Sequence, residues 1–126
     1  MSFVNDIKYV MNNDPSICGW IDGSIGYERL NRDFNLTQKW LLYYFKKNEQ
    51  VNSMNNKKIY TNYELYTIII TPKNEDMLTI SNRLVEYLNG QTYQSVVDIS
   101  FYNDDHAFDN ERNVYTNTLT FNVIGE

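Results

Sequence analysis

The strongest constraint on the fold is the segment Thr71–Gly90, which has the pattern of one amphipathic helix. Its apolar residues recur at steps of three and four, which places them on one face of a helix. Asn74 is the expected N-terminal cap, and Gly90 stands where a left-handed residue would end the helix. The apolar face consists of Met77, Leu78, Ile80, Leu84, Val85 and Leu88. Such a face must pack against a sheet or another helix, and the flanking segments predict a sheet.

Four segments have strand-like sequences, and they flank this helix in pairs. Val114–Ile124 alternates most cleanly, with Tyr115, Leu119, Phe121 and Val123 expected inward and Thr116, Thr118, Thr120 and Asn122 outward. The other three strand candidates are Gln38–Lys47, Tyr60–Thr71 and Gln94–Tyr102. Ser2–Asn12 predicts a short N-terminal helix. The predicted class is α+β, a mostly antiparallel sheet of about four strands with one long helix packed on a face and a short N-terminal helix.

The remaining segments predict turns and loops. Residues 16–27 alternate apolar residues with glycine, which suggests an irregular, partly extended stretch with tight turns. Residues 28–37, 48–58 and 103–113 are mostly polar and are expected to be loops.

Length and charge exclude several classes of protein. A chain of 126 residues is expected to form a single domain over residues 1–126. The net charge of −5 argues against an autonomous nucleic-acid binder, which would carry a basic patch. One cysteine excludes an internal disulfide, and neither a signal peptide nor a run long enough to span a bilayer is recognisable. These features predict a soluble protein of a cytoplasm-like compartment.

The densest group of chemically active side chains lies near the C-terminus. A histidine among carboxylates can bind a divalent ion or act as a general base. However, the spacing lacks the rhythm of a calcium loop, and no second histidine exists in the chain. A solvated acidic hairpin loop is therefore favoured, and no metal or cofactor is expected. The group comprises Asp104, Asp105, His106, Asp109 and Glu111.

Two other groups have both a chemical and a structural interpretation. Cys18 is more readily a buried thiol than a nucleophile paired with His106, because no motif surrounds it. Five aromatic side chains could stack on bases or sugars, but packing in the core or at a subunit interface is favoured. They are Trp20 and the run Trp40, Tyr43, Tyr44 and Phe45. Lysines at 46, 47, 57 and 58 give the two ends of the 48–58 segment a local positive charge.

The order of these elements resembles that of the small tail-terminator or tail-completion proteins of tailed bacteriophages. The similarity rests on an N-terminal helix, the Gly/aromatic segment Ile17–Tyr27, two strands, the Thr71–Gly90 helix and two closing strands. Its most suggestive part is a terminal hairpin. The first strand of that hairpin runs out through Phe-Tyr-Asn-Asp-Asp at 101–105, and the second closes the chain through Thr-Leu-Thr-Phe-Asn-Val at 118–123.

The resemblance implies a structural virion protein without catalytic activity. It implies a ring, usually a hexamer, at the neck between head and tail, with DNA passing through the lumen and with portal-side and tail-tube proteins as partners. The protein would reside in the virion after assembly in the host cytoplasm. The loops 48–58 and 103–113 would reach those partners. The candidate protomer interface consists of Trp40, Tyr43, Tyr44, Phe45, Lys57 and Lys58, and the candidate lumen or partner loop of Asp104, Asp105, His106, Asp109 and Glu111.

Two alternative functions stay open. One is a small acidic protein-binding module, of the inhibitor or immunity type, that presents the carboxylates of residues 104–111 to a basic partner. The other is a small enzyme centred on His106, which would need a concave pocket around that residue.

Overall fold

The computed structural model describes residues 2–13, 15–21, 25–27, 38–52, 59–90 and 96–125. Five strands form one sheet in the order β1-β2-β3-β5-β4. Strand β1 pairs in parallel with β2, and every other neighbouring pair is antiparallel. The elements in chain order are α1 (Ser2–Asn13), α2 (Pro15–Trp20), β1 (Ile25–Tyr27), β2 (Trp40–Asn52), β3 (Ile59–Thr71), α3 (Asn74–Leu88), β4 (Val96–Asp109) and β5 (Val114–Gly125).

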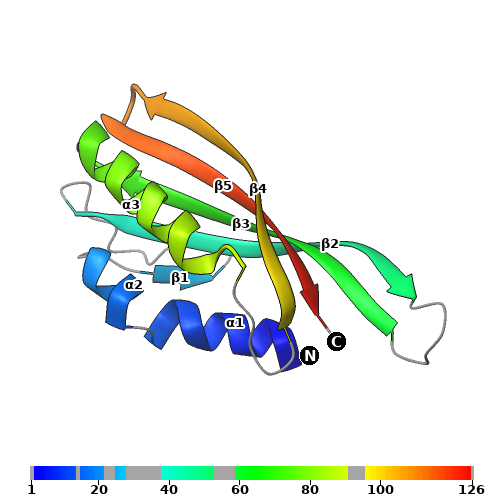
Figure 1. Ribbon diagram of the computed structural model, residues 1–126. Helices are drawn as coiled ribbons and strands as arrows, with labels where there is room; N and C mark the ends of the chain where they lie inside the picture. Colours follow the sequence, from blue (N-terminus) through cyan, green and yellow to red (C-terminus); the bar gives the residue numbers. More distant parts are fainter. Residues whose placement is uncertain are drawn as a thin grey trace.

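The helices share one core with one face of the sheet (Figure 1). The predicted α+β class is confirmed, but the sheet has a fifth short strand and a second short helix precedes it. None of the helices in the described ranges is long and apolar enough to cross a membrane. The largest fully buried side chains come from the three helices and from strands β2, β3 and β5. They are Ile7, Met11, Ile17, Leu41, Tyr43, Leu65, Ile69, Met77, Leu84, Leu88 and Phe121.

Helix α3 matches the predicted helix in position, but its start differs in detail. Asn74 is the first helical residue, and the N-cap is Lys73, which makes no side-chain capping hydrogen bond. The Thr71 hydroxyl instead donates to the Lys73 carbonyl at 2.6 Å and fixes the chain just before the helix. Gly90 has a φ of +78°, which confirms the left-handed residue expected after the helix. Leu78 was expected on the apolar face but is 40% exposed.

The N-terminal region differs more from the prediction. The predicted first helix is confirmed, ending at Asn13. The segment 16–27, expected to be irregular, contains helix α2 and strand β1. Helix α2 begins at Pro15, the position where a missing N–H costs least and where the fixed φ suits a helix. Ile17 of this helix is fully buried, which explains why so short a helix is retained.

Two of the predicted loops contain strand. Strand β2 continues to Asn52, so the first part of the predicted 48–58 loop is strand, and residues 53–58 lie outside the described residues. Strand β4 runs through most of the predicted 103–113 loop and ends at Asp109. Both errors have one cause: these parts of the strands carry polar residues at successive positions, so their sequences show no alternation.

The second face of the sheet is not covered by any described helix. Strand β5 alternates as predicted, with Leu119, Phe121 and Val123 buried in the core. Its outward threonine row is half-buried, except that Thr120 is only 9% exposed. This open face also carries Leu42, Tyr44, Glu64, Tyr66, Ile68 and Ile70, all of them partly exposed.

Candidate assembly surface on strand β4

Strand β4 forms one edge of the sheet and is the most exposed strand in the described residues. It pairs with β5 on one side only, and all eight residues from Phe101 to Phe108 are exposed. Three large apolar side chains lie on this stretch, Phe101, Tyr102 and Phe108, and Tyr102 is 68% exposed. An edge of this length presents a row of backbone donors and acceptors to another chain.

The C-terminal end of α3 covers the first half of this edge. The Gly90 N–H donates to the Ile99 carbonyl at 2.6 Å, and the Phe101 N–H donates to the Asn89 side-chain oxygen at 2.9 Å. The ladder with β5 then shifts register between Phe101 and Asn103, which leaves Tyr102 as an inserted bulge residue. No described segment covers the edge in the same way between Asn103 and Asp109.

The bulge reverses which side chains of β4 face the helices. Before it, Ile99 and Phe101 stand opposite the core residues Val123 and Phe121. After it, the residues opposite core-facing positions of β5 are Asp104, His106 and Phe108, whose partners are Leu119, Asn117 and Tyr115. Asp105 consequently lies on the other, open face of the sheet.

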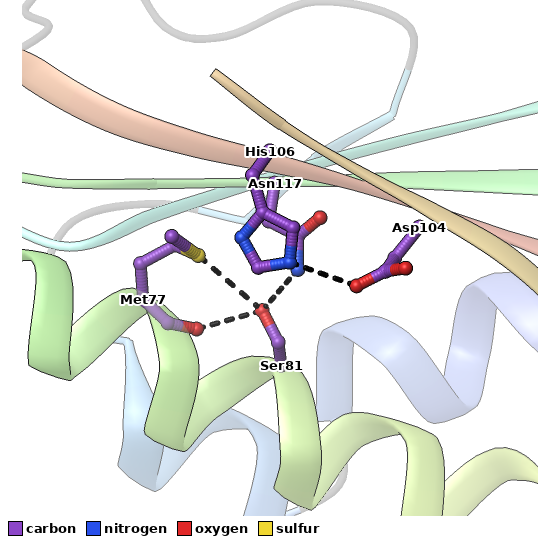
Figure 2. Close-up of polar contacts among 5 residues, drawn as sticks. All are labelled: Met77, Ser81, Asp104, His106 and Asn117. Atoms are coloured by element: carbon purple, nitrogen blue, oxygen red, sulfur yellow. Dashed lines mark hydrogen bonds and ion pairs between the residues drawn. The ribbon is translucent and has the colours of Figure 1, made fainter. Parts of the chain in front are cut away.

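Asp104 and His106 form an exposed pair next to a buried polar network, as Figure 2 shows. His106 Nε2 lies 2.8 Å from Asp104 Oδ2, and both side chains are 45% exposed. Beneath them, Asn117 Nδ2 donates to Ser81 Oγ at 2.9 Å, and the Ser81 hydroxyl donates to the Met77 carbonyl at 2.6 Å. Asn117 Oδ1 is buried and has no hydrogen-bond partner. This network joins α3 to β5.

The rest of the predicted acidic cluster is dispersed by the hairpin. Asp109 is structural: its Oδ1 accepts the N–H groups of Glu111 at 3.0 Å and Arg112 at 3.2 Å. The turn closes when the Asn113 N–H donates to the Asp109 carbonyl at 2.8 Å, with Asn113 in the left-handed region at φ 59°. Among the residues the structure describes, no three His, Cys, Asp or Glu side chains gather as a metal site would need.

The predicted aromatic interface run divides between the two faces of β2. Tyr43 is fully buried and its hydroxyl accepts the Asn12 Nδ2–H at 2.9 Å, so it joins α1 to the sheet. Trp40 is 3% exposed, and Phe45 packs edge-on against Tyr63 with centroids 6.2 Å apart. The register places Trp40, opposite Ile70, on the same open face as Tyr44, whereas Tyr43 and Phe45 lie on the core face. Lys57 and Lys58 lie outside the described residues, and the Cys18 side chain does too.

The open face holds one polar pair that the sequence did not reveal. Tyr66 stacks on Tyr44 across the β2–β3 pair, with ring centroids 5.0 Å apart and an angle of 16°. The Tyr66 hydroxyl donates to Glu64 Oε2, and this hydrogen bond, followed by burial and by the charge of Glu64, raises the pKa of Tyr66 to about 12. Residues i and i+2 of a strand share a face. The two-residue spacing of Glu64 and Tyr66 in a predicted strand could therefore have indicated that their side chains are neighbours.

A shallow groove lies between α2 and α3. It is lined by Trp20, Arg83, Glu86 and Tyr87, and the Trp20 and Tyr87 rings meet edge to face at 6.2 Å. The groove is open, and His106 is not among its lining residues.

Comparison with known proteins gives a structural likeness. No protein-family model matches the chain, and no curated protein sequence matches it. A solved structure titled "Virion of native gene transfer agent (GTA) particle" contains a chain with the same fold, at a TM-score of 0.69 and 10% sequence identity. The alignment covers 95% of this chain and 91% of that chain.

Proposed function

We propose that this protein is a structural component of a phage-like virion. The observation that carries the proposal is the shared fold with a virion chain over nearly the whole length of both chains. Two proteins with the same architectural role are expected to match over their whole lengths, and here neither chain has a large unmatched part. The exposed edge strand and the uncovered sheet face support the same proposal, since a protein that functions within an assembly needs contact surfaces.

The finer proposal is a tail-terminator or tail-completion protein that forms a ring at the head–tail neck. It follows from the resemblance in element order, from the N-terminal helix to the closing hairpin. In a closed ring each protomer contributes two different complementary surfaces, and the sheet of this chain has two unlike edges. The expected neighbours of the ring are portal-side and tail-tube proteins.

The charge of the chain is compatible with DNA passing through such a ring. A net charge of −5 per protomer would be multiplied around the lumen and would repel the DNA phosphates. Salt would weaken this repulsion without removing it at close range. We therefore expect DNA to pass without being bound, and no catalytic step is proposed for Asp104 or His106.

The mass of the purified chain in solution tests the ring directly. Light scattering on a sizing column should give about six copies of the 15.0 kDa chain, about 90 kDa in all, at the higher concentrations. Electron micrographs of the same fraction should show closed rings with a central opening. A monomer at every concentration would contradict self-assembly of the isolated chain.

A second candidate is an acidic binding module, favoured by the exposed carboxylates of Asp104 and Asp105 on an open strand edge. Such a module would be a monomer or a dimer and would capture a basic partner protein. Isolation of one stoichiometric basic partner together with a monomeric mass would favour this function over the ring.

A further inference from the structure

We propose that Asn103–Ala107, on the open half of the β4 edge, pairs with the part of the outer β2 edge that β1 leaves uncovered, in a second copy of this chain. The pairing is antiparallel and sets Asp105 opposite Lys46. This inference rests on the proposed ring and names the two surfaces that the ring would join. It follows from four features of the sheet.

The first feature is the direction of the backbone groups on β4. In an antiparallel pair, every second residue turns its N–H and C=O away from its neighbour strand. Ile99 and Phe101 do so, because their outward groups bond to Gly90 and Asn89. The β5 ladder continues without insertion past the bulge, so the same alternation assigns the outward groups to Asp104, His106 and Phe108.

The second feature is the charge on this edge, which selects the partner. Two β4 edges paired with each other about Asp104 or Asp105 would set carboxylates of both copies opposite one another, and like charges across a strand pair are destabilising. A symmetric β4–β4 dimer in these registers is therefore disfavoured. A basic edge is the complementary partner.

The third feature is a basic edge on the other side of the sheet. In the described ranges, β1 is the one strand that pairs with the outer side of β2, and it spans only Leu41 to Tyr43. Beyond it lie Lys46, which is exposed, and then Lys47. Ile99 stands opposite Val123 on β5, Val123 opposite Tyr63 on β3, and Tyr63 opposite Lys47. Because hydrogen-bonded and non-hydrogen-bonded pairs alternate across the sheet, the N–H and C=O of Lys47 point outward, as those of Ile99 do.

The fourth feature is the register that these constraints allow. Residues with outward groups must stand opposite one another, so Asp104 pairs with Lys47. An antiparallel arrangement then sets Asp105 opposite Lys46. Both of these side chains belong to the open face of the sheet, as a directly opposite pair requires, and their Cβ atoms would lie about 5 Å apart. Moving the register by two residues would place Ala107 opposite Lys46 and lose this ion pair.

The two open edges lie at opposite ends of the strands, which gives the assembly a stagger. Lys46 is level with Glu64 and Asn122, whereas Asp105 is level with Thr118. Each copy would be displaced along the strand direction relative to the next. A closed ring of strands accommodates such a displacement by tilting its strands, as β-barrels do.

Disulfide cross-linking tests the pairing. In a Cys18→Ser background, a mixture of the single variants Asp105→Cys and Lys46→Cys should form a linked dimer under mild oxidation, and the double variant should form a ladder of multimers. Within one chain these positions lie about 14 Å apart across the sheet and are also displaced by four residues along it, beyond the reach of a disulfide. The matched control, Ala107→Cys with Lys46→Cys, should link at least several-fold less.

A charge exchange gives a second readout that does not depend on cysteine chemistry. Asp105→Lys and Lys46→Asp should each weaken association about two- to five-fold per contact, and the double exchange should restore it. Dimers of Asp105→Cys alone would show β4–β4 pairing and overturn the inference. An oligomer by light scattering without specific links would also overturn it while leaving the proposed ring standing. A monomeric wild-type chain at every concentration would overturn both.

Discussion

The buried contact between Ser81 and Asn117 leads to a prediction about stability. The Ser81 hydroxyl donates to the Met77 carbonyl, lies 3.8 Å from Met77 Sδ and accepts a hydrogen bond from Asn117 Nδ2. Replacing Ser81 by Ala would leave the whole Asn117 amide without a partner, since its Oδ1 already lacks one. A buried polar group that loses its partner costs about 1–3 kcal/mol, so S81A should lower the free energy of unfolding by that amount.

The reciprocal substitution should behave differently. Asn117→Val removes the unpaired oxygen and suits a buried strand position, while the Ser81 hydroxyl keeps its bond to Met77. We expect its cost to lie near zero or to be negative. The double variant should resemble Asn117→Val alone, because the amide that made S81A costly is then absent.

Urea unfolding followed by circular dichroism measures these differences. With a slope of about 1–3 kcal/mol/M, the S81A midpoint should fall by about 1 M. Thr79→Ala is the matched control: its hydroxyl makes the same backbone bond, to the Glu75 carbonyl at 2.8 Å, but is exposed. Measurements at two protein concentrations separate folding from association. A neutral S81A, or an Asn117→Val that costs more than S81A, would refute the reasoning.

Three further predictions concern single sites. Alkaline absorbance titration should show that Tyr66→Phe removes a tyrosine titrating at about pH 12, and that Glu64→Gln lowers the pKa of Tyr66. Because the pKa of Tyr66 in the folded protein lies above the ordinary 10.0, its contact with Glu64 stabilises the fold fully below pH 10. This stabilisation is lost as the pH rises through 12. Leu84→Ala should cost about 2–5 kcal/mol in urea unfolding, whereas Leu78→Ala should change stability by less than about 0.5 kcal/mol, and equal costs would contradict the assigned helix face. Gly90→Ala should cost about 1 kcal/mol in the same assay because of its positive φ, and an unchanged midpoint would count against that conformation.

The sequence predicted those elements whose burial follows a regular period. Helix α3 and strand β5 each have one buried face, so their apolar residues recur at 3.6 or 2 residues and define both type and orientation. Gly90 could be recognised because its conformation is one that other residues avoid. Asn74 could not be distinguished from Lys73 as the cap, because the cap is fixed here by the extended backbone of Lys73 and not by a side-chain hydrogen bond that a sequence could indicate.

The candidate surface was harder to predict, for a physical reason. An edge strand with two exposed faces has no apolar face to impose a period, so the sequence of β4 from Asn103 to Asp109 resembled a loop. The acidic cluster was recognised from its composition, but the sequence could not show that its members separate in the structure. Asp104 and Asp105 lie on opposite faces of the sheet, and Asp109 caps a turn. Tyr43 was expected at an interface but is fully buried, because an aromatic run does not reveal which of its side chains pack in the core.

The strand order also implies an order of events in folding. The β2–β3 and β4–β5 pairs each join neighbouring strands, so each hairpin can form from local contacts. The β3–β5 pair is different: it joins Thr61 to Gly125, and its strands are separated in the sequence by α3 and β4. We therefore expect this ladder, and the Ser81–Asn117 contact beside it, to form after the two hairpins. Substitutions in the hairpins should then slow refolding, whereas substitutions at the β3–β5 seam should mainly accelerate unfolding.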